Sequence, residues 1–324
     1  MERFGPPDVM SWVDGPTPER GMDEVLVRVE AIGVNFADTM VRRGEYRRDQ
    51  PLDFTPGFEV AGRVLEGPAG GPRPGTAVVV FTEHGRGYAD TVVAPLDHVF
   101  AVAEGVSTVQ AAALFTQGVT AVYAVGRYAR VRPGDAVLIH AGAGGLGALC
   151  IQLVADAGGR AIATASTEAK LAIARGHGAV ETLISDPHTL TERVRAASGG
   201  GVQAVIDGVG GPLFAPSLRA LAFGGRYVVV GSASQEPATV DVRALMPRGQ
   251  TIVGFVVARV AEEDPSEPQR AFDEVQRLFL AGRLRPQLTV MAAEEVVHAH
   301  ELIESRTLTG KIVLALDGAA IGGH

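Results

Sequence analysis

The chain has 324 residues, a length that favours two domains of ordinary size over one. Hydrophobic residues make up 46% of it and charged residues 20%, so the composition excludes a disordered chain. The formal net charge of −8 argues against general affinity for nucleic acid, and no stretch approaches the run of about 18 apolar residues that a membrane span needs. We therefore expect a cytoplasmic globular protein without a nucleic-acid or membrane partner.

The first 118 residues indicate a β-rich, barrel-like domain. Short strand-like runs are separated by glycine and proline, and they cover residues 24–32, 59–65, 77–81 and 88–93. An alanine-rich stretch over 107–128 then predicts a helix, with a break expected at Gly118.

From residue 131 onward, strand-like runs alternate with helical ones. The expected strands cover 136–139, 161–164, 182–184, 204–206, 226–230 and 251–257, and the helices between them cover 146–157, 168–175, 189–197 and 213–221. Such alternation is typical of βαβ units that build a parallel sheet.

After residue 258 the pattern changes again. An acidic, proline-containing segment over 261–267 predicts a surface linker, and helices over 269–280 and 293–305 and strands near 287–290 and 311–316 follow it. We expect a β-rich domain formed by residues 1–118 and 258–324, with residues 119–257 inserted as a dinucleotide-binding domain.

A glycine-rich loop is the most informative motif of the chain. It lies between an apolar run and an amphipathic helical pattern, which is the context that G-x-G-x-x-G requires. Glycine permits the tight turn and close approach to a pyrophosphate, and the helix start supplies amide donors. A purely structural glycine turn is the alternative interpretation. The predicted contacts are Gly142, Ala143, Gly144, Gly145, Leu146 and Gly147.

The end of the next strand indicates which dinucleotide binds. NAD-preferring sites carry a carboxylate there, whereas this chain has Thr164, Ala165 and Ser166. Lys170, one of only two lysines in the chain, follows within one turn and could bind a 2′-phosphate as a point charge. A solvated surface lysine is the alternative. The pattern favours NADPH over NADH.

Metal and hydrolytic chemistry find little support. The chain has a single cysteine, Cys150, within an apolar helical stripe, which favours a core position over a reactive thiol. His298 and His300 are two residues apart on an expected helix and make a poor metal pair. His140 beside the glycine loop is better explained as a packed histidine than as a catalyst. We expect no bound metal.

Across nearly its whole length the chain resembles the medium-chain dehydrogenase/reductase superfamily, within its zinc-independent quinone oxidoreductase and zeta-crystallin branch. The resemblance rests on residues 33–38, 44–46, 56–62, 117–121, 131–135, 142–147 and 309–311. It implies an α/β fold in which a Rossmann-type, doubly wound parallel sheet is inserted in a β-rich, GroES-like barrel domain. Phe58 stands where zinc-dependent relatives have a histidine ligand, so reduction of an activated acceptor is favoured over alcohol oxidation.

The resemblance also implies site residues. Asn35 would lie near the nicotinamide and substrate, with a backbone-bonding turn residue as the alternative, and Tyr46 would line the active cleft, either as a proton donor or as an aromatic lid. Met40 and Ser185 replace tyrosines found in some relatives. Further cofactor contacts are expected from Thr120, Ser166, Lys170, Val209, Ser232, Ala233, Phe255, Arg306 and Lys311.

The function expected from these residues is NADPH-dependent hydride transfer to a small-molecule quinone or conjugated enone. An enoyl-thioester reductase is an alternative, and a non-catalytic NADPH-binding sensor or crystallin-like protein is another. The apolar strand over 251–257 resembles the edge through which related enzymes pair, so a homodimer is expected.

Overall fold

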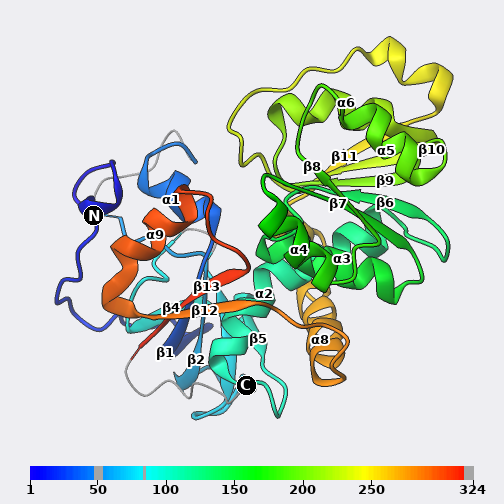
Figure 1. Cartoon of the computed structure of the whole chain (residues 1–324). Coiled ribbons are helices and arrows are strands. Elements are labelled where there is room, and N and C mark those ends of the chain that lie inside the picture. Colours follow the sequence, from blue (N-terminus) through cyan, green and yellow to red (C-terminus); the bar gives the residue numbers. More distant parts are fainter. Residues whose placement is uncertain (47–53, 83–84, 317–324) are drawn as a thin grey trace. The chain divides into compact units, whose positions relative to one another are not determined.

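The structure is a computed structural model that describes residues 1–46, 54–82 and 85–316. The chain forms two compact units (Figure 1). The first comprises Met1–Thr116, Asp264–Leu280 and Gln287–His324, and the second comprises Gln117–Glu263 and Ala281–Pro286. The short segment 281–286, expected in the β-rich domain, thus groups with the inserted one.

The first unit is built on a seven-stranded sheet. Its strands are β1 (Glu24–Val34), β2 (Glu59–Glu66), β3 (Ala77–Phe81), β4 (Thr91–Pro95), β5 (Val99–Ala101), β12 (Leu288–Ala292) and β13 (Lys311–Ala315). The order is β12-β13-β1-β2-β3-β5, and β4 pairs with the first half of β1. All pairs are antiparallel except β12 with β13. Strand β5 was not predicted, because three residues are too few to show a pattern.

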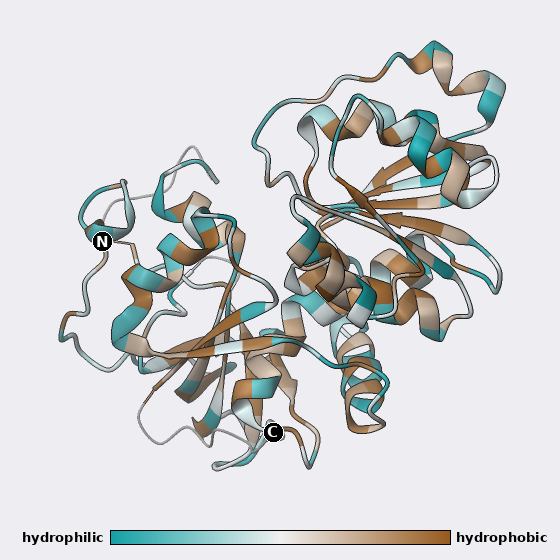
Figure 2. Cartoon of the chain, viewed as in Figure 1, coloured by the Kyte–Doolittle hydropathy of each residue, from teal (hydrophilic) through white to brown (hydrophobic). Residues whose placement is uncertain are grey.

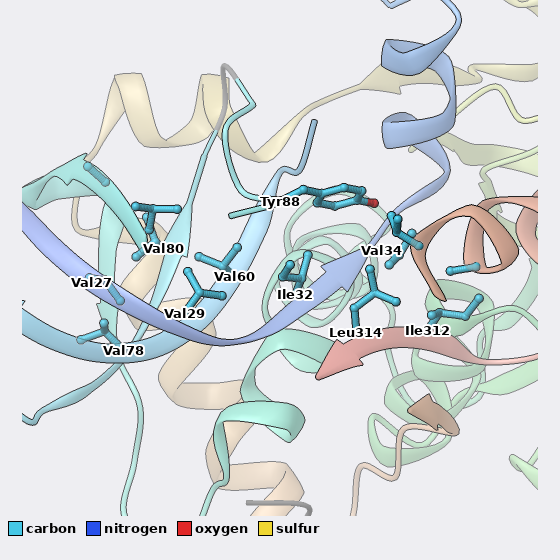
Figure 3. Close-up of a cluster of buried hydrophobic side chains, with 14 of the residues drawn as sticks. Val27, Val29, Ile32, Val34, Val60, Val78, Val80, Tyr88, Ile312 and Leu314 are labelled. Carbon is cyan, nitrogen blue, oxygen red and sulfur yellow. The ribbon is translucent and has the colours of Figure 1, made fainter. Parts of the chain in front are cut away.

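Alternating side chains of these strands form the core of the first unit. Val27, Val29 and Ile32 of β1 pack in one cluster with Val60, Val80 and Leu314 (Figure 3). Tyr88 lies at the edge of the cluster, and its hydroxyl is the polar tip of an otherwise apolar group. In Figure 2 much of the hydrophobic colour lies on the strands, in agreement with their place in the core.

Four helices complete the first unit in whole or in part: α1 (Phe36–Arg42), α2 (Thr108–Val122), α8 (Glu267–Leu280) and α9 (Val296–Glu304). Helix α2 begins in the first unit and ends in the second, and a π-helical segment, Tyr123–Tyr128, extends it. The break predicted at Gly118 is wrong. Phe115, Val119 and Ala121 are fully buried, and this packing outweighs the low helix propensity of one glycine.

The stretch Thr108–Tyr128 is also long and apolar enough to cross a membrane by length and composition. However, 67% of its most apolar window is buried inside the protein, as in a core helix, so it gives no support to a membrane span.

The second unit is a doubly wound α/β domain. Its parallel strands are β6 (Ala136–Ile139), β7 (Arg160–Ala165), β8 (Glu181–Ile184), β9 (Val202–Asp207), β10 (Leu221–Val229) and β11 (Thr251–Gly254). Connecting helices are α3 (Gly145–Asp156), α4 (Glu168–Gly176), α5 (Leu190–Ser198) and α6 (Phe214–Ala220). The order β11-β10-β9-β6-β7-β8 places the switch point between β6 and β9, as in a Rossmann fold. The predicted fold class is confirmed.

The end of the second unit differs from the prediction. The strand expected over 251–257 ends at Gly254, and the linker expected over 261–267 is largely helical, because α7 (Val257–Glu263) precedes α8. Val257 and Val260 are buried, so an apolar face stabilises this short helix despite its acidic end.

Candidate functional site

The glycine loop connects β6 to α3 in the second unit, at the switch point of the sheet. A Cβ added to Gly147 would lie 2.4 Å from the Ala141 carbonyl oxygen, and one added to Gly145 would lie 2.0 Å from Gln117 Oε1. Gly144 has more room, with a nearest contact of 3.3 Å. The turn therefore depends on glycine at 147, where the contact is with backbone, whereas the Gln117 side chain near Gly145 can move; the predicted strand–turn–helix context is present.

The start of α3 offers free donors. Gly144 is its N-cap residue and makes no side-chain cap, and the helical ladder begins with the Ala148 amide bonding to the Gly144 carbonyl. Amides before that point have no partner within the helix, and the helix dipole adds partial positive charge. Ala141 has a φ of 52°, a strained conformation that is common where backbone approaches a ligand. Such a turn suits a pyrophosphate.

His140, beside this loop, is a packed residue. Its Nδ1 lies 2.8 Å from Thr164 Oγ1, and its Nε2 lies 2.7 Å from Ser217 Oγ. The Ser217 hydroxyl donates to the Leu213 carbonyl, so Nε2–H donates to Ser217 and Nδ1 accepts from Thr164. Burial lowers the pKa of His140, which keeps the ring neutral.

Asp207, at the end of β9, organises the next loop at this edge of the sheet. Its Oδ1 accepts from the amides of Val209 (2.7 Å) and Gly210 (3.0 Å), and Oδ2 accepts from the Tyr227 hydroxyl. Burial, and then Asp207, raise the pKa of Tyr227. Ala233 donates to the Gly208 carbonyl, which joins the loop after β10 to the loop after β9. Predicted residues Val209, Ser232 and Ala233 therefore share one rim.

The end of β7 carries Ser166 in an exposed position, followed by α4. The Thr167 hydroxyl caps α4 by accepting from the Lys170 amide at 3.3 Å. Lys170 is partly buried in the first turn of the helix, and burial lowers the pKa of its ammonium group. Ser166, and not a carboxylate, directly follows the strand, while Glu168 in the first turn of α4 lies 3.4 Å from Arg175.

Two further predicted residues lie near the π-helical segment. The ring of Phe255, just after β11, stacks on Tyr128 with centroids 4.4 Å apart, and it meets Tyr123 edge-on at 6.1 Å. Thr120 is half-buried within α2. π-Helical turns are frequent at functional sites, which fits the position of Phe255 at the carboxyl end of the sheet.

Strand register gathers a second set of polar residues in the first unit. Gly33 of β1 is paired with Glu59 of β2, and a Cβ at position 33 would lie 2.6 Å from Glu59 Oε1. Val34 is paired with Ile312 of β13, so the next residues along, Asn35 and Lys311, face each other. Glycine at 33 leaves the space in which the Glu59 side chain reaches both of them.

The Asn35 amide is fully engaged on its nitrogen side. Nδ2 donates to Glu59 Oε1 at 2.8 Å and to the Gly33 carbonyl at 3.2 Å, while Oδ1 accepts from Lys311 Nζ at 2.7 Å. In this conformation Asn35 therefore has no free side-chain N–H group with which to bind an acceptor carbonyl.

Lys311 has a different partner from the one expected. Its side chain is 1% exposed and its ammonium forms an ion pair with Glu59, whose other oxygen accepts from the Thr116 amide at 2.8 Å. Expected as a cofactor contact, Lys311 instead closes a buried cluster with Asn35 and Glu59.

Asp38 fixes the backbone of Asn35, because its Oδ2 accepts from the Asn35 amide at 2.8 Å. Its Oδ1 is buried without a hydrogen-bond partner among the described residues. Burial raises the pKa of the Asp38 carboxyl to about 7, although the Asn35 amide opposes this change. The carboxyl therefore titrates near neutral pH.

A buried polar chain lies next to Asp38. Tyr88 Oη is 2.9 Å from His300 Nε2, and His300 Nδ1 is 3.3 Å from Arg42, which pairs with Glu304. Burial and then Arg42 lower the pKa of His300 to about 3, and burial and then Asp38 raise that of Tyr88. Arg42 can only donate, so His300 is neutral and donates to Tyr88.

Tyr46 follows α1 and is 43% exposed, with its ring 5.2 Å from that of Phe58 in an edge-on contact. Its neighbour Phe58 directly precedes Glu59 in the chain. Arg306 is exposed after α9 and has a φ of 56°. Among the described residues, no group of three or more histidine, cysteine or acidic side chains could hold a metal ion.

Sequence reasoning singled out Asn35 and Lys311 but not Glu59, Asp38 or Asp207. Each missed residue is an acid within or next to a mainly apolar strand or helix, and all three are at most 1% exposed. A buried acid must be paired or protonated, so an isolated acid inside an apolar pattern was the available signal.

Comparison with known proteins agrees with this architecture. Residues 21–104 match the family model of the alcohol dehydrogenase GroES-like domain, and residues 145–277 match that of zinc-binding dehydrogenase. The chain is 33% identical to quinone oxidoreductase-like protein 2 of Bos taurus, over 90% of this chain and 85% of that protein. It is 31% identical to the quinone oxidoreductase of Sus scrofa, over 97% and 96%.

Solved structures give the same result. A quinone oxidoreductase of Pseudomonas syringae superposes with a TM-score of 0.90 at 30% identity, covering 97% of this chain and 98% of that one. The Escherichia coli quinone oxidoreductase complexed with NADPH gives 0.89 at 27% identity, with the same coverage. The chain belongs to the quinone oxidoreductase branch of the medium-chain dehydrogenase/reductase superfamily.

Proposed function

We propose that this protein is an NADPH-dependent oxidoreductase that transfers a hydride to a quinone or a conjugated enone without a metal ion. The observation that carries the proposal is the glycine turn at the switch point of the parallel sheet, together with Ser166 in place of a carboxylate directly after β7 and Lys170 in the first turn of α4. A carboxylate there would repel a 2′-phosphate, whereas an ammonium group attracts it.

The residues of the second unit fit the cofactor. The space at Gly144 and the unpaired amides at the start of α3 suit a pyrophosphate, and the rim formed by Val209, Ser232 and Ala233 suits the nicotinamide half. When bound, NADPH supplies the hydride. The chain itself would hold the phosphates at the start of α3, and Phe255 is the candidate contact of the nicotinamide half.

On the acceptor side, Tyr46 is the candidate donor to the acceptor carbonyl. Its ring contacts that of Phe58 edge-on, and the residue is 43% exposed. A hydrogen bond to the carbonyl oxygen makes the conjugated system more electron-poor, and Tyr46 or water then supplies the proton. Phe58 cannot bind a metal, which supports a zinc-independent reaction.

We also propose that the protein forms a homodimer. Strand β11 is the last strand at one side of the six-stranded sheet, and its residues are exposed or half-buried. An unpaired strand edge is a ready template for a second copy.

The test is NADPH oxidation by the purified protein with an ortho-quinone, a short enone and an enoyl thioester in parallel, and with NADH as the control. Faster quinone or enone turnover with NADPH supports the proposal. Turnover of the thioester alone would identify an enoyl-thioester reductase, and tight NADPH binding without any turnover would identify a non-catalytic binding protein.

Tyr46→Phe sharpens this test, because it keeps the ring contact with Phe58 and removes only the hydroxyl. We expect enone turnover to fall about 100-fold while NADPH affinity stays unchanged. A variant with full enone activity would show that Tyr46 is an aromatic lid.

A further inference from the structure

The hydrogen bonds of Asn35 fix what its side chain can offer a ligand. A primary amide has two N–H donors and two lone pairs on oxygen. Both donors are used, by Glu59 Oε1 and by the Gly33 carbonyl, and one lone pair accepts from Lys311. A single lone pair on Oδ1 remains.

The orientation of the amide is set by the charges around it. A flipped amide would turn its oxygen toward the Glu59 carboxylate and its N–H groups toward the Lys311 ammonium, and both contacts would be repulsive. The two charged groups are at most 1% exposed, so water does not screen them. Asn35 is 9% exposed and is therefore the most exposed of these three residues.

We propose that Glu59 and Lys311 lock the Asn35 amide so that this position of the site accepts a hydrogen bond from a ligand hydroxyl and does not bind a carbonyl oxygen. The inference rests on the proposed function, since the ligands in question are those of an NADPH-dependent reductase. Glu59 and Lys311 act as positioning residues, and Asn35 is the contact.

Two ligand groups have this chemistry. One is a hydroxyl of the nicotinamide ribose, and the other is the phenolic hydroxyl of a hydroquinone product. A quinone or enone oxygen would meet a lone pair at this position, which leaves Tyr46 as the donor to the carbonyl.

The composition of the chain makes the lock directly observable. Asn35 is the only asparagine of the 324 residues, so protein labelled with nitrogen-15 and carbon-13 asparagine gives one side-chain amide signal by NMR. In the ligand-free protein we expect the two Nδ2 protons to be well dispersed and slow to exchange with solvent. Fast exchange, as in a free amide, would overturn the lock.

Ligand titrations then test whether Asn35 accepts a hydrogen bond, and they distinguish the ribose hydroxyl from the hydroquinone hydroxyl. A change in the chemical shift of the Asn35 side-chain carbonyl carbon (Cγ) on adding NADPH would assign the ribose hydroxyl as the donor. The change should be absent with the analogue that lacks this hydroxyl on the nicotinamide ribose. A shift seen only when hydroquinone is added to the NADP-bound protein, and absent with its methyl ether, would assign the product. Loss of Nδ2 protection on binding a quinone or enone would contradict the proposal, as would a carbonyl carbon that no ligand moves.

Variants distinguish an effect of the ion pair on the Asn35 amide from an effect on folding. Lys311→Met combined with Glu59→Gln removes both buried charges together, so neither is left unpaired. We expect this double variant to fold while the exchange of the Nδ2 protons accelerates at least about tenfold. Unchanged exchange in the folded double variant would rule out the role of the ion pair.

The proposed function can fail separately from this inference. If NADPH does not bind by fluorescence, the function fails, yet the protected amide in the free protein still tests the lock. If NADPH binds and is oxidised but Asn35 does not respond, only the inference fails.

Discussion

In the unit with the parallel sheet, the loop expected to hold a pyrophosphate is one continuous segment between β6 and α3. In the β-rich unit, Asn35, Glu59 and Lys311 come from three places in the chain, and Asn35 and Lys311 are 276 residues apart. The glycine loop can be predicted from the local sequence, because the spacing and number of its glycines define it. The cluster in the β-rich unit exists only because strand register brings β1, β2 and β13 together.

This difference predicts where a substitution acts most strongly. A charge that loses its partner in this cluster stays buried away from water, whereas residues expected to contact the cofactor act mainly on its binding. Substitutions in the cluster should therefore lower stability most, and substitutions of side chains that would contact the cofactor should act mainly on binding.

Lys311→Met should give the largest effect. It leaves the Glu59 carboxylate buried without its ion-pair partner, and the expected loss in the free energy of unfolding is about 3–5 kcal/mol. Denaturant unfolding measures it. Lys170→Met is the matched control, because Lys170 is the only other lysine, and it should change stability by less than about 0.5 kcal/mol. Equal losses in both variants would remove the distinction between the two regions.

Asp38→Asn should come next and should depend on pH. The pKa of Asp38 in the folded protein, about 7, lies above its ordinary value of 3.8, so the folded state holds the proton more strongly. The stabilisation this provides is full below about pH 4 and is lost as pH rises through 7. Asparagine removes that loss, so the variant should be more stable than the wild type at pH 8 by up to about 4 kcal/mol.

The two proteins should converge in stability near pH 4, and unfolding curves at several pH values check this. Substitution of the exposed Asp8 by asparagine is the control and should leave the pH dependence unchanged. A wild type whose stability does not fall between pH 5 and 8 would show that Asp38 is ionised throughout.

Gly147→Ala should destabilise by about 1–3 kcal/mol, because the added methyl group meets the Ala141 carbonyl oxygen at 2.4 Å. Gly144→Ala has a nearest contact of 3.3 Å and should change stability by less than about 1 kcal/mol. Thermal unfolding of the two variants compares them. If both behave alike, close packing is not what fixes glycine in this turn.

Lys170→Ala should have the smallest effect on the fold and a selective one on binding. Losing a charge-assisted contact to a phosphate should raise the Kd for NADPH about tenfold or more, with the Kd for NADH unchanged. Fluorescence titration with both nucleotides provides the measurement and its internal control. An equal rise in the Kd for NADPH and for NADH would mean that Lys170 does not bind the 2′-phosphate.

The contrast between the local loop and the cluster built by strand register also explains which features could be predicted from the sequence. The parallel sheet and its glycine loop could be predicted, because apolar runs, helix periodicity and glycine spacing are local signals. Helix α1 and strand β5 were missed, since seven and three residues carry too little pattern. The partner of Lys311 could not be predicted, because it depends on which strands become neighbours. Gly118 shows the opposite case, in which burial overrode a correct local preference.

The most direct test of the account is to follow the hydride itself. The protein is incubated with an enone and NADPH deuterated at the transferred position of nicotinamide C4, and the product is analysed by mass spectrometry. We expect one deuterium bound to carbon in the reduced enone. NADPH consumption without deuterium in the product would contradict direct hydride transfer.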